Sequence, residues 1–260
     1  MDMPDNAPLR DLSVLVTRPA EQAEAFCRMI EHAGGRALRF PLVNIVARER
    51  NDIVKTQLAW LADSDIAIFI SANAVEYALR AIERLPPQLK IAAVGNATAA
   101  RLRTRGIAVD IVPASGFNSE ALLDCAELQQ VSGKRIAIVR GVGGRELLAT
   151  TLRQRGAEVR YIEVYQRQRP TTPLSALDDY QSCQLIVITS PDALHNLLAL
   201  CDDTRWLFNT ALVTNSQRSA DLAGRLGFGA NILVSPSPAD EAMSATIKAW
   251  WQRRRDARQA

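Results

Sequence analysis

The stretch Ile-Ala-Ile-Phe-Ile-Ser-Ala-Asn-Ala at residues 66–74 joins an unbroken apolar run to a serine and then to a helical pattern. Residues 185–193, Leu-Ile-Val-Ile-Thr-Ser-Pro-Asp-Ala, repeat the arrangement. An apolar run without alternation is typical of a strand buried on both faces, as in a parallel sheet covered by helices. A serine before an amphipathic segment predicts a helix start. Both stretches therefore predict a buried strand followed by a helix.

Short β-branched runs of this kind alternate with longer helical patterns along the whole chain. The predicted strands are residues 13–17, 37–40, 66–70, 91–94, 109–112, 135–139, 159–164, 185–189, 211–214 and 232–234. Amphipathic segments at 20–33, 74–84, 97–105 and 146–155 predict helices, and Ser119 is the predicted cap of another. This alternation predicts an α/β fold with parallel sheets.

An internal repeat relates the two halves of the chain. At an offset of 119 residues, Ser71 aligns with Ser190 and Asn96 with Asn215, and at 121 residues Gly35 aligns with Gly156. Chance similarity among βα units is the competing explanation, but the offset stays nearly constant. The repeat and the length of 260 residues predict two similar lobes. Ligands of open α/β sheets bind outside the carboxyl ends of the strands, so a cleft between two such edges is the expected site.

Composition and charge exclude several classes of protein. A content of 48% hydrophobic and 23% charged residues is ordinary for a globular protein. The net charge of +3 comes from the C-terminal tail, because the last eight residues hold four arginines and one aspartate. A neutral body argues against nucleic-acid binding. Arginines outnumber lysines 27 to 4, which fits either anion binding or a codon preference.

The four cysteines and two histidines form no local metal-binding motif, so no metal is expected. The acidic, polar N-terminus does not resemble a signal peptide, and the apolar runs are too short for a membrane span. These features predict a cytoplasmic protein that does not bind membranes.

The turns that follow the predicted strands are rich in Ser, Thr, Asn and Gly. Such turns leave free backbone N–H groups at helix N-termini, where anions bind, although ordinary helix capping uses the same residues. Seven turns of this kind facing one cleft would suit an elongated polyanion. The residues expected to bind it are Arg18, Ser71, Ala72, Asn73, Thr98, Arg140, Gly141, Gly143, Gly144, Arg145, Ser190 and Ser216.

Familiar catalytic and cofactor motifs are missing from the sequence. Gly141 and Gly143 fit the start of a dinucleotide loop, with Glu163 placed to meet a ribose hydroxyl, but Glu146 stands at the third glycine position. No nucleophile elbow, Walker loop or zinc-protease motif is present. Tyr165 ends a predicted strand near the crossover between the halves, which suits either an aromatic at a domain edge or a functional residue.

Seven segments, in this order and spacing, resemble the uroporphyrinogen-III synthase family between residues 12 and 250. They are Val14-Leu-Val-Thr-Arg-Pro-Ala-Glu-Gln-Ala, Gly34-Gly35 with Phe40-Pro41, Phe69-Ile-Ser-Ala-Asn-Ala-Val, Val94-Gly-Asn-Ala-Thr-Ala, Val139-Arg-Gly-Val-Gly-Gly-Arg-Glu-Leu-Leu, Glu163-Val-Tyr-Gln-Arg and Thr189-Ser-Pro-Asp-Ala-Leu. Two features depart from the family: residues 213–216 lack its usual glycine-containing turn, and residues 1–11 are a polar extension.

The resemblance implies two flavodoxin-like lobes with a cleft between them and a two-stranded hinge. Residues 1–39 with 169–260 would form a discontinuous first lobe, and residues 45–162 the second. Residues 40–44 and 163–168 would form the linker. A two-strand hinge would allow the lobes to move on binding.

The resemblance also implies a reaction, the cyclisation of linear hydroxymethylbilane to uroporphyrinogen III with inversion of ring D and loss of water. The substrate carries carboxylates that the turns would hold, and Tyr165 would assist the departing hydroxyl group as the catalytic residue. No cofactor is expected, and the protein is expected to be a monomer. The alternative from the residues alone is a non-catalytic two-lobed binder of an anionic metabolite or dinucleotide.

Overall fold

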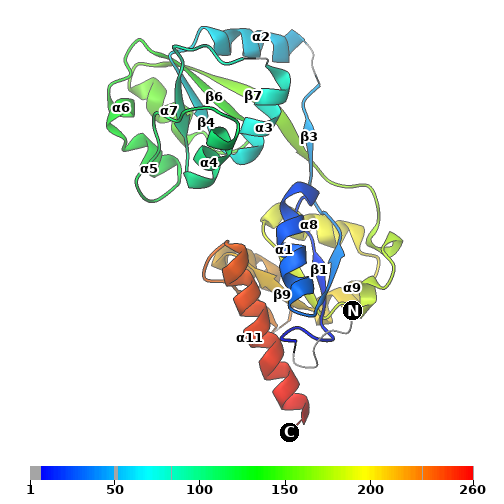
Figure 1. Cartoon of the computed structure of the whole chain (residues 1–260). Coiled ribbons are helices and arrows are strands. Elements are labelled where there is room, and N and C mark those ends of the chain that lie inside the picture. Colours follow the sequence, from blue (N-terminus) through cyan, green and yellow to red (C-terminus); the bar gives the residue numbers. More distant parts are fainter. Residues whose placement is uncertain (1–6, 50–51, 83, 230, 260) are drawn as a thin grey trace. The chain divides into compact units, whose positions relative to one another are not determined.

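The computed structural model describes residues 7–49, 52–82, 84–229 and 231–259, which form two compact units (Figure 1). The first unit combines the chain up to Asn44 with the chain from Gln168 onward, and the second is Ile45–Arg167. Each unit contains one five-stranded sheet. The predicted α/β class is therefore confirmed, and each sheet takes strands from both halves of the chain.

In the first unit all sheet pairings are parallel, in the order β10-β9-β8-β1-β2. Its strands are β1 (Ser13–Val16), β2 (Arg36–Arg39), β8 (Leu185–Ile188), β9 (Ala211–Thr214) and β10 (Ile232–Val234). Its helices are α1 (Ala20–His32), α8 (Pro191–Leu200), α9 (Thr204–Asn209), α10 (Gln217–Arg225) and α11 (Asp240–Gln259). Taken in chain order the strands lie 2-1-3-4-5, which is the flavodoxin-like arrangement.

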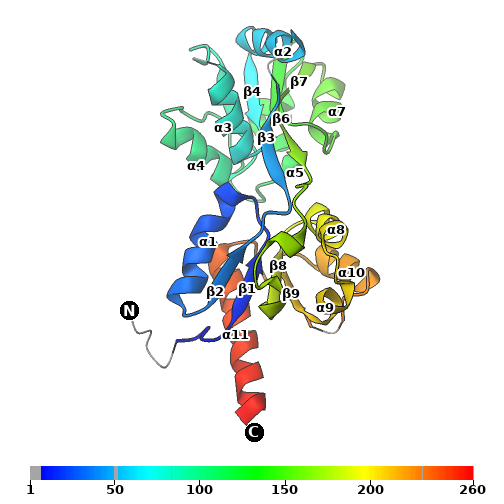
Figure 2. The same ribbon diagram turned by 90° about the vertical axis from the view of Figure 1, so that its right-hand side faces the viewer.

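Helices cover both faces of the first sheet, with α1 and α11 on one face and α8 to α10 on the other (Figure 2). Val14, Val16 and Val187 point to the α1 face, where they pack with Phe26 and Trp251. The intervening strand residues face the other way because successive side chains of a strand alternate. This burial on both faces explains the unbroken apolar runs of the sequence.

The second sheet has the order β3-β7-β6-β4-β5, and its described pairings among β4 to β7 are parallel. Its strands are β3 (Asn44–Ala47), β4 (Ile66–Phe69), β5 (Lys90–Ala93), β6 (Arg135–Gly141) and β7 (Glu158–Gln168). Its helices are α2 (Asp52–Ala62), α3 (Ala72–Ala81), α4 (Asn96–Thr104), α5 (Ser119–Leu123), α6 (Ala126–Gln129) and α7 (Leu147–Gln154). From β5 to β7 this order repeats that of the first sheet from β2 to β9, so the two units share an arrangement of four strands.

Two apolar clusters lie on opposite faces of the second sheet. Phe69 and Val139 pack against α2, α3 and α4, on what we call the α3 face. Ile68 and Ile138 pack against α5, α6 and α7, on the α7 face. The two faces matter for the site because the side chains at the strand ends point to one face or the other.

Two local predictions differ from the structure. Residues 109–112 do not form a strand, since only Ile111 bridges to Ala92 and Pro113 supplies no N–H to continue the ladder. Asn118 rather than Ser119 caps α5, because its Oδ1 accepts the Ala121 N–H at 2.8 Å. Residues 163–168, predicted as one strand of the two-stranded linker, are the end of β7.

Glu76 joins α3 to α4 and makes the second unit sensitive to acid. Its carboxylate is buried, accepts the Arg105 Nε–H at 3.1 Å and lies 2.9 Å from Nε of Arg101. The hydrogen bond from Arg105, aided by Arg101 and opposed by burial, holds the pKa of Glu76 below its usual value. A lowered folded-state pKa stabilises the fold above the unfolded pKa of about 4.3, and that contribution is lost as the pH falls through the folded value.

We therefore expect Glu76→Gln to unfold at a lower temperature than the wild type at pH 7. The gap should narrow as the pH falls below about 4, where the wild-type carboxylate also becomes protonated. Thermal melts monitored by circular dichroism between pH 3 and 7 measure the gap, and Glu127→Gln, at an exposed glutamate of α6, is the control. A gap that is constant across this range would contradict the assignment.

Candidate functional site at the carboxyl edge of the second sheet

A cavity of about 190 Å³ lies at the carboxyl ends of the strands in the second unit. Its floor is set by β4 and β6, which are neighbours in space but not consecutive in the chain. Such a switch in strand order is where open α/β sheets bind ligands. The lining residues are Ile70, Val94, Ser119, Ile138, Arg140, Gly141, Gly143, Gly144, Arg145, Leu148, Tyr161, Tyr165 and Arg167.

Tyr165 reaches this cavity because β7 contains a bulge. Tyr161 packs on the α7 face and Tyr165 on the α3 face, although residues four apart in a regular strand share a face. The register shifts between Arg140, which pairs with Glu163, and Gly141, which pairs with Tyr165. The extra residue in β7 turns Tyr165 over, and bulges commonly re-aim a side chain in this way.

The Tyr165 side chain is buried and held on three sides. Its hydroxyl lies 3.3 Å from Oγ of Ser71, which follows β4 and caps α3 by accepting the Ala74 N–H. Its ring packs against Tyr77, with 5.6 Å between the ring centroids. On the third side it covers Gly141, where a Cβ atom would lie only 2.5 Å from Cε2 of the ring. The glycine is required for this close approach, not for its backbone freedom.

Arg140 ends β6 with a buried guanidinium that is only partly satisfied. Its Nε donates to the Gly141 carbonyl at 3.1 Å, and Nη1 lies 3.5 Å from Oε1 of Glu146. Its Nη2 is buried and has no hydrogen-bond partner among the residues that the structure describes. That nitrogen is next to Gly144, where a Cβ atom would come within 2.6 Å. A buried donor without a partner is costly in a folded protein, so this nitrogen is a candidate ligand contact.

Tyr161 and Glu146 support Arg140 from the α7 face. The guanidinium carbon lies 4.4 Å from the centroid of the Tyr161 ring, and the Tyr161 hydroxyl donates to Glu146 at 2.5 Å. Burial, and then the hydrogen bond to the Glu146 carboxylate, raises the pKa of Tyr161. The phenol therefore remains a neutral hydrogen-bond donor. Sequence reasoning did not select either residue for the site, since only the fold brings positions 146 and 161 together.

The loop between β6 and α7 forms the rim of the cavity. Gly143 and Gly144 have φ values of 75° and 109°, in the region that favours glycine. Arg145 extends outward and pairs with Glu120 of α5 at 3.3 Å. The cavity also has Ser119 and Arg167 in its lining, which the sequence analysis did not select.

The other predicted residues of the second unit occupy helix starts. Ala72 and Asn73 begin α3 directly after Ser71. Thr98 is buried in the first turn of α4 and does not line the cavity. The structure thus places Ser71, Arg140, Gly141, Gly143, Gly144, Arg145 and Tyr165 at one edge of the sheet.

In the first unit the predicted residues also follow strand ends, but most are engaged locally. Ser190 and Ser216 cap α8 and α10 by accepting the N–H groups of Ala193 and Ser219. The Arg18 side chain is buried, pairs with Asp240 at the start of α11 and lies 4.5 Å over the Phe26 ring. Their predicted contacts with a substrate remain predictions.

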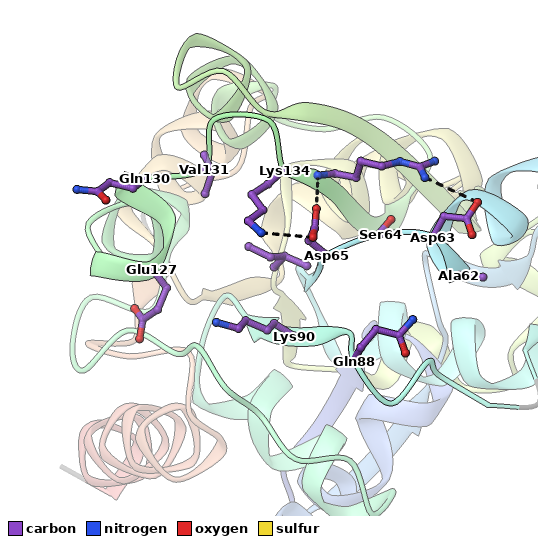
Figure 3. A pocket seen from close by; sticks show the side chains of 12 residues that line it. Ala62, Asp63, Ser64, Asp65, Gln88, Lys90, Glu127, Gln130, Val131 and Lys134 are labelled. Atoms are coloured by element: carbon purple, nitrogen blue, oxygen red, sulfur yellow. Dashed lines mark hydrogen bonds and ion pairs between the residues drawn. The ribbon is translucent and has the colours of Figure 1, made fainter.

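A larger cavity, of about 660 Å³, lies at the opposite end of the second sheet (Figure 3). It adjoins the amino ends of β4, β5 and β6 rather than their carboxyl ends. Asp65 accepts the Arg135 N–H at 2.8 Å and lies 3.5 Å from Nζ of Lys134, so its carboxylate links the strand starts. The Ser64 hydroxyl likewise donates a hydrogen bond to the Trp60 carbonyl. One buried donor there, Nε of Arg135, has no hydrogen-bond partner among the described residues and lies 3.9 Å from the Glu158 carboxylate. Because ligands of open α/β sheets bind at the carboxyl ends of the strands, we place the functional site at the smaller cavity.

The dinucleotide alternative finds no support at the loop that suggested it. Glu163, expected at a ribose, pairs with Arg48 at 2.6 Å. Glu146 places its carboxylate on Arg140 and Tyr161, inside the region that a pyrophosphate would occupy. Among the described residues, His, Cys, Asp and Glu side chains form no group that could hold a metal ion. None of the described helices has the length and apolar composition needed to cross a bilayer.

Comparisons with known proteins agree on one family. The family model described as Uroporphyrinogen-III synthase HemD matches residues 24–245. The chain is 35% identical to the uroporphyrinogen-III synthase of Salmonella typhimurium and 34% identical to that of Escherichia coli, each over 91% of this chain and 100% of the relative. A Thermus thermophilus uroporphyrinogen III synthase structure covers 93% of this chain and 99% of its own, with a TM-score of 0.63 at 19% identity, which shows the shared fold. By sequence and by fold, the chain belongs to the uroporphyrinogen-III synthase family and is an enzyme of that family.

Proposed function

We propose that the chain cyclises hydroxymethylbilane to uroporphyrinogen III, with inversion of ring D and loss of water, at the carboxyl edge of the second sheet. The observation that carries this assignment is one cavity lined by both Tyr165 and Arg140, with the Ser71 hydroxyl 3.3 Å from that of Tyr165 and the Arg140 Nη2 left without a partner among the described residues. Family membership supplies the reaction, and these groups supply its chemical requirements.

Substrate binding rests on carboxylate recognition. The bilane carries eight carboxylates, and hydrogen bonds between a guanidinium and a carboxylate are among the strong ones in proteins. Arg140 offers a buried, pre-positioned donor, and Arg145 offers an exposed one at the rim. The cavity is smaller than the about 300–1,000 Å³ typical of small-molecule sites, so it receives one part of the substrate.

The chemical step needs a proton or hydrogen bond for the hydroxyl group that leaves ring A. Tyr165 is the donor, and Ser71 and the rings beside it fix the direction of its O–H. As the C–O bond breaks, the phenol proton passes to the departing oxygen and water leaves, while the ring A nitrogen donates its electron pair to the carbon. Ring D then forms the new C–C bond to that carbon, and the proton that ring D loses on closure returns to the Tyr165 phenolate. A positioned general acid contributes about 10²–10⁴-fold to a rate.

Orientation is the second contribution, because the bilane closes unaided to the uninverted isomer. Holding reacting carbons in the productive geometry can contribute about 7–11 kcal/mol in favourable cases. Freshly made bilane, incubated with and without the protein and resolved by chromatography of the oxidised porphyrins, tests this proposal. We expect isomer III with the protein and isomer I in buffer. Isomer I alone at every protein concentration would contradict the assignment.

Arg140→Ala should raise KM about tenfold or more with little change in kcat, since a hydrogen bond to a charged group contributes about 1.5–3 kcal/mol. Arg145→Ala should raise KM less, about twofold to threefold, because its side chain is 73% exposed and its charge is screened by solvent. Steady-state kinetics, with bilane supplied by a coupled assay, measure the KM values of both variants.

The matched control is Arg28→Ala, at an exposed arginine of α1 in the first unit, which should leave KM unchanged. Melting temperatures of all three variants separate lost binding from lost folding. If Arg140→Ala bound the bilane as well as the wild type, the open nitrogen would not be a substrate contact.

A further inference from the structure

Exposed large apolar side chains gather at the carboxyl edge of the second unit. Among the described residues only Ile53, Phe117, Val142, Leu147 and Val234 belong to this class. Phe117 precedes α5, and Val142 and Leu147 belong to the connection from β6 into α7. Single exposed apolar residues are ordinary. Three exposed apolar residues in two connections beside one cavity call for a physical explanation.

Val142 lies directly beside the candidate catalytic tyrosine. Its backbone N–H donates to the Tyr165 carbonyl at 2.9 Å, and its neighbour Gly141 carries the Tyr165 ring. Val142 is nevertheless 46% exposed. Val142 is thus a β-branched residue in a loop with three glycines, and it contributes little of its apolar surface to the core.

Phe117 is exposed at a position where its backbone is strained. Its φ is 35°, a left-handed value that costs a non-glycine residue about 1–3 kcal/mol. Its Cβ lies so close to the turn after β5 that a Cβ atom on Gly95 would be 3.0 Å away. Phe117 as a whole remains 48% exposed. The strain is not offset by burial of the ring, which points to a role outside the packing of the unit.

The two connections are joined at the cavity. Ser119, two residues after Phe117, lines the cavity together with Gly141, Gly143 and Gly144. The ion pair of Arg145 with Glu120 ties the glycine loop to α5. Phe117 and Val142 are thus mounted on two linked segments that border the same opening.

We propose that Phe117 and Val142 form an apolar subsite that contacts the face of one pyrrole ring of the bilane. This proposal rests on the proposed function and deepens it. Each ring of the substrate carries acidic side chains, so contacts with carboxylates alone do not fix the tilt of a ring. An aromatic and an aliphatic side chain against the ring face fix that tilt beside Tyr165, and the ring covers apolar surface that is otherwise exposed to water.

Phe117→Asn and Val142→Thr test the subsite. Asparagine tolerates the left-handed backbone and threonine matches valine in shape, so both variants remove apolar surface at little cost to folding. We expect each to raise KM for the bilane about tenfold, which corresponds to partial loss of a buried apolar side chain. At bilane concentrations below KM the product should shift from isomer III toward isomer I.

Ile53→Ser is the matched control, because Ile53 is 56% exposed in the same unit but lies on α2. It should keep the wild-type KM, and Phe117→Tyr, which restores the ring, should also keep it. Phe117→Gly should leave the melting temperature unchanged or raise it while KM rises, because glycine relieves the strained φ.

The outcomes separate this inference from the proposed function. If the wild type makes isomer III and both variants keep its KM and isomer ratio, the subsite is refuted and the function stands. If Phe117→Gly melts lower and binds normally, Phe117 has a packing role. If the wild type makes no isomer III, the proposed function fails first.

Discussion

Tyr165→Phe should lower kcat for uroporphyrinogen III formation about a hundredfold, with a change of less than threefold in KM. The phenylalanine keeps the ring that packs on Tyr77 and Gly141 and loses only the hydroxyl beside Ser71. The variant therefore folds and binds as the wild type does, but nothing at this position donates a proton to the departing hydroxyl. A loss in kcat with an unchanged KM is the signature of an interaction made in the transition state.

Single-turnover kinetics with the isomer ratio as readout measure this effect, since spontaneous closure to isomer I sets the background. Tyr180→Phe, in the first unit, is the control and should keep the wild-type rate and isomer ratio. An unchanged rate for Tyr165→Phe would remove this hydroxyl from the mechanism and leave backbone N–H groups as the donors.

Gly141→Ala should reduce kcat at least tenfold and destabilise the chain by about 1–3 kcal/mol. The added methyl group would overlap the Tyr165 ring at 2.5 Å, and that ring is held by Tyr77 and Ser71. The ring must shift, and a displacement of about 1 Å at a reacting group can cost on the order of a hundredfold in rate. The effect arises from space alone, because the backbone at Gly141 has no left-handed φ.

The control is Gly224→Ala in α10, where a Cβ atom meets nothing within 4 Å. It should stabilise the protein by up to about 1 kcal/mol, as expected for alanine in a helix, and leave kcat unchanged. In a Tyr165→Phe background, Gly141→Ala should cost little further rate, since the hydroxyl is already absent. Full additivity of the two rate losses would show that Gly141 acts by another route.

Local patterns predicted the strands well where burial is complete. Residues 66–70 and 185–189 are strands β4 and β8, extended by one residue in the prediction, because apolar runs this short can be buried on both sides only within a covered sheet. The pattern failed at residues 109–112, where Pro113 leaves no donor and one bridge replaces a strand. The apolar residues there pack as parts of the two clusters, Val109 and Val112 on the α3 face and Ile111 on the α7 face, and periodicity does not distinguish such packing from a strand.

The residues of the site likewise divide into those that local patterns predicted and those that only the fold brings together. Turn composition was enough to select Ser71, Arg140, Gly141 and Arg145, since the carboxyl ends of parallel strands share an edge. It did not select Tyr161, Glu146 or Phe117. Their roles depend on partners 6 to 22 residues distant in sequence, as in the ion pair of Arg140 with Glu146 and the close approach of Phe117 to Gly95.

The amino-acid sequence by itself determined the α/β class, the repeat of its βα units and the turns that carry the polar residues, because helix caps and apolar runs are local properties of the chain. The tertiary structure alone decided which of those turns share a cavity and which way each side chain points. The bulge in β7 shows why: one extra residue moves Tyr165 from the α7 face to the α3 face, and it is seen only when β7 is paired with β6.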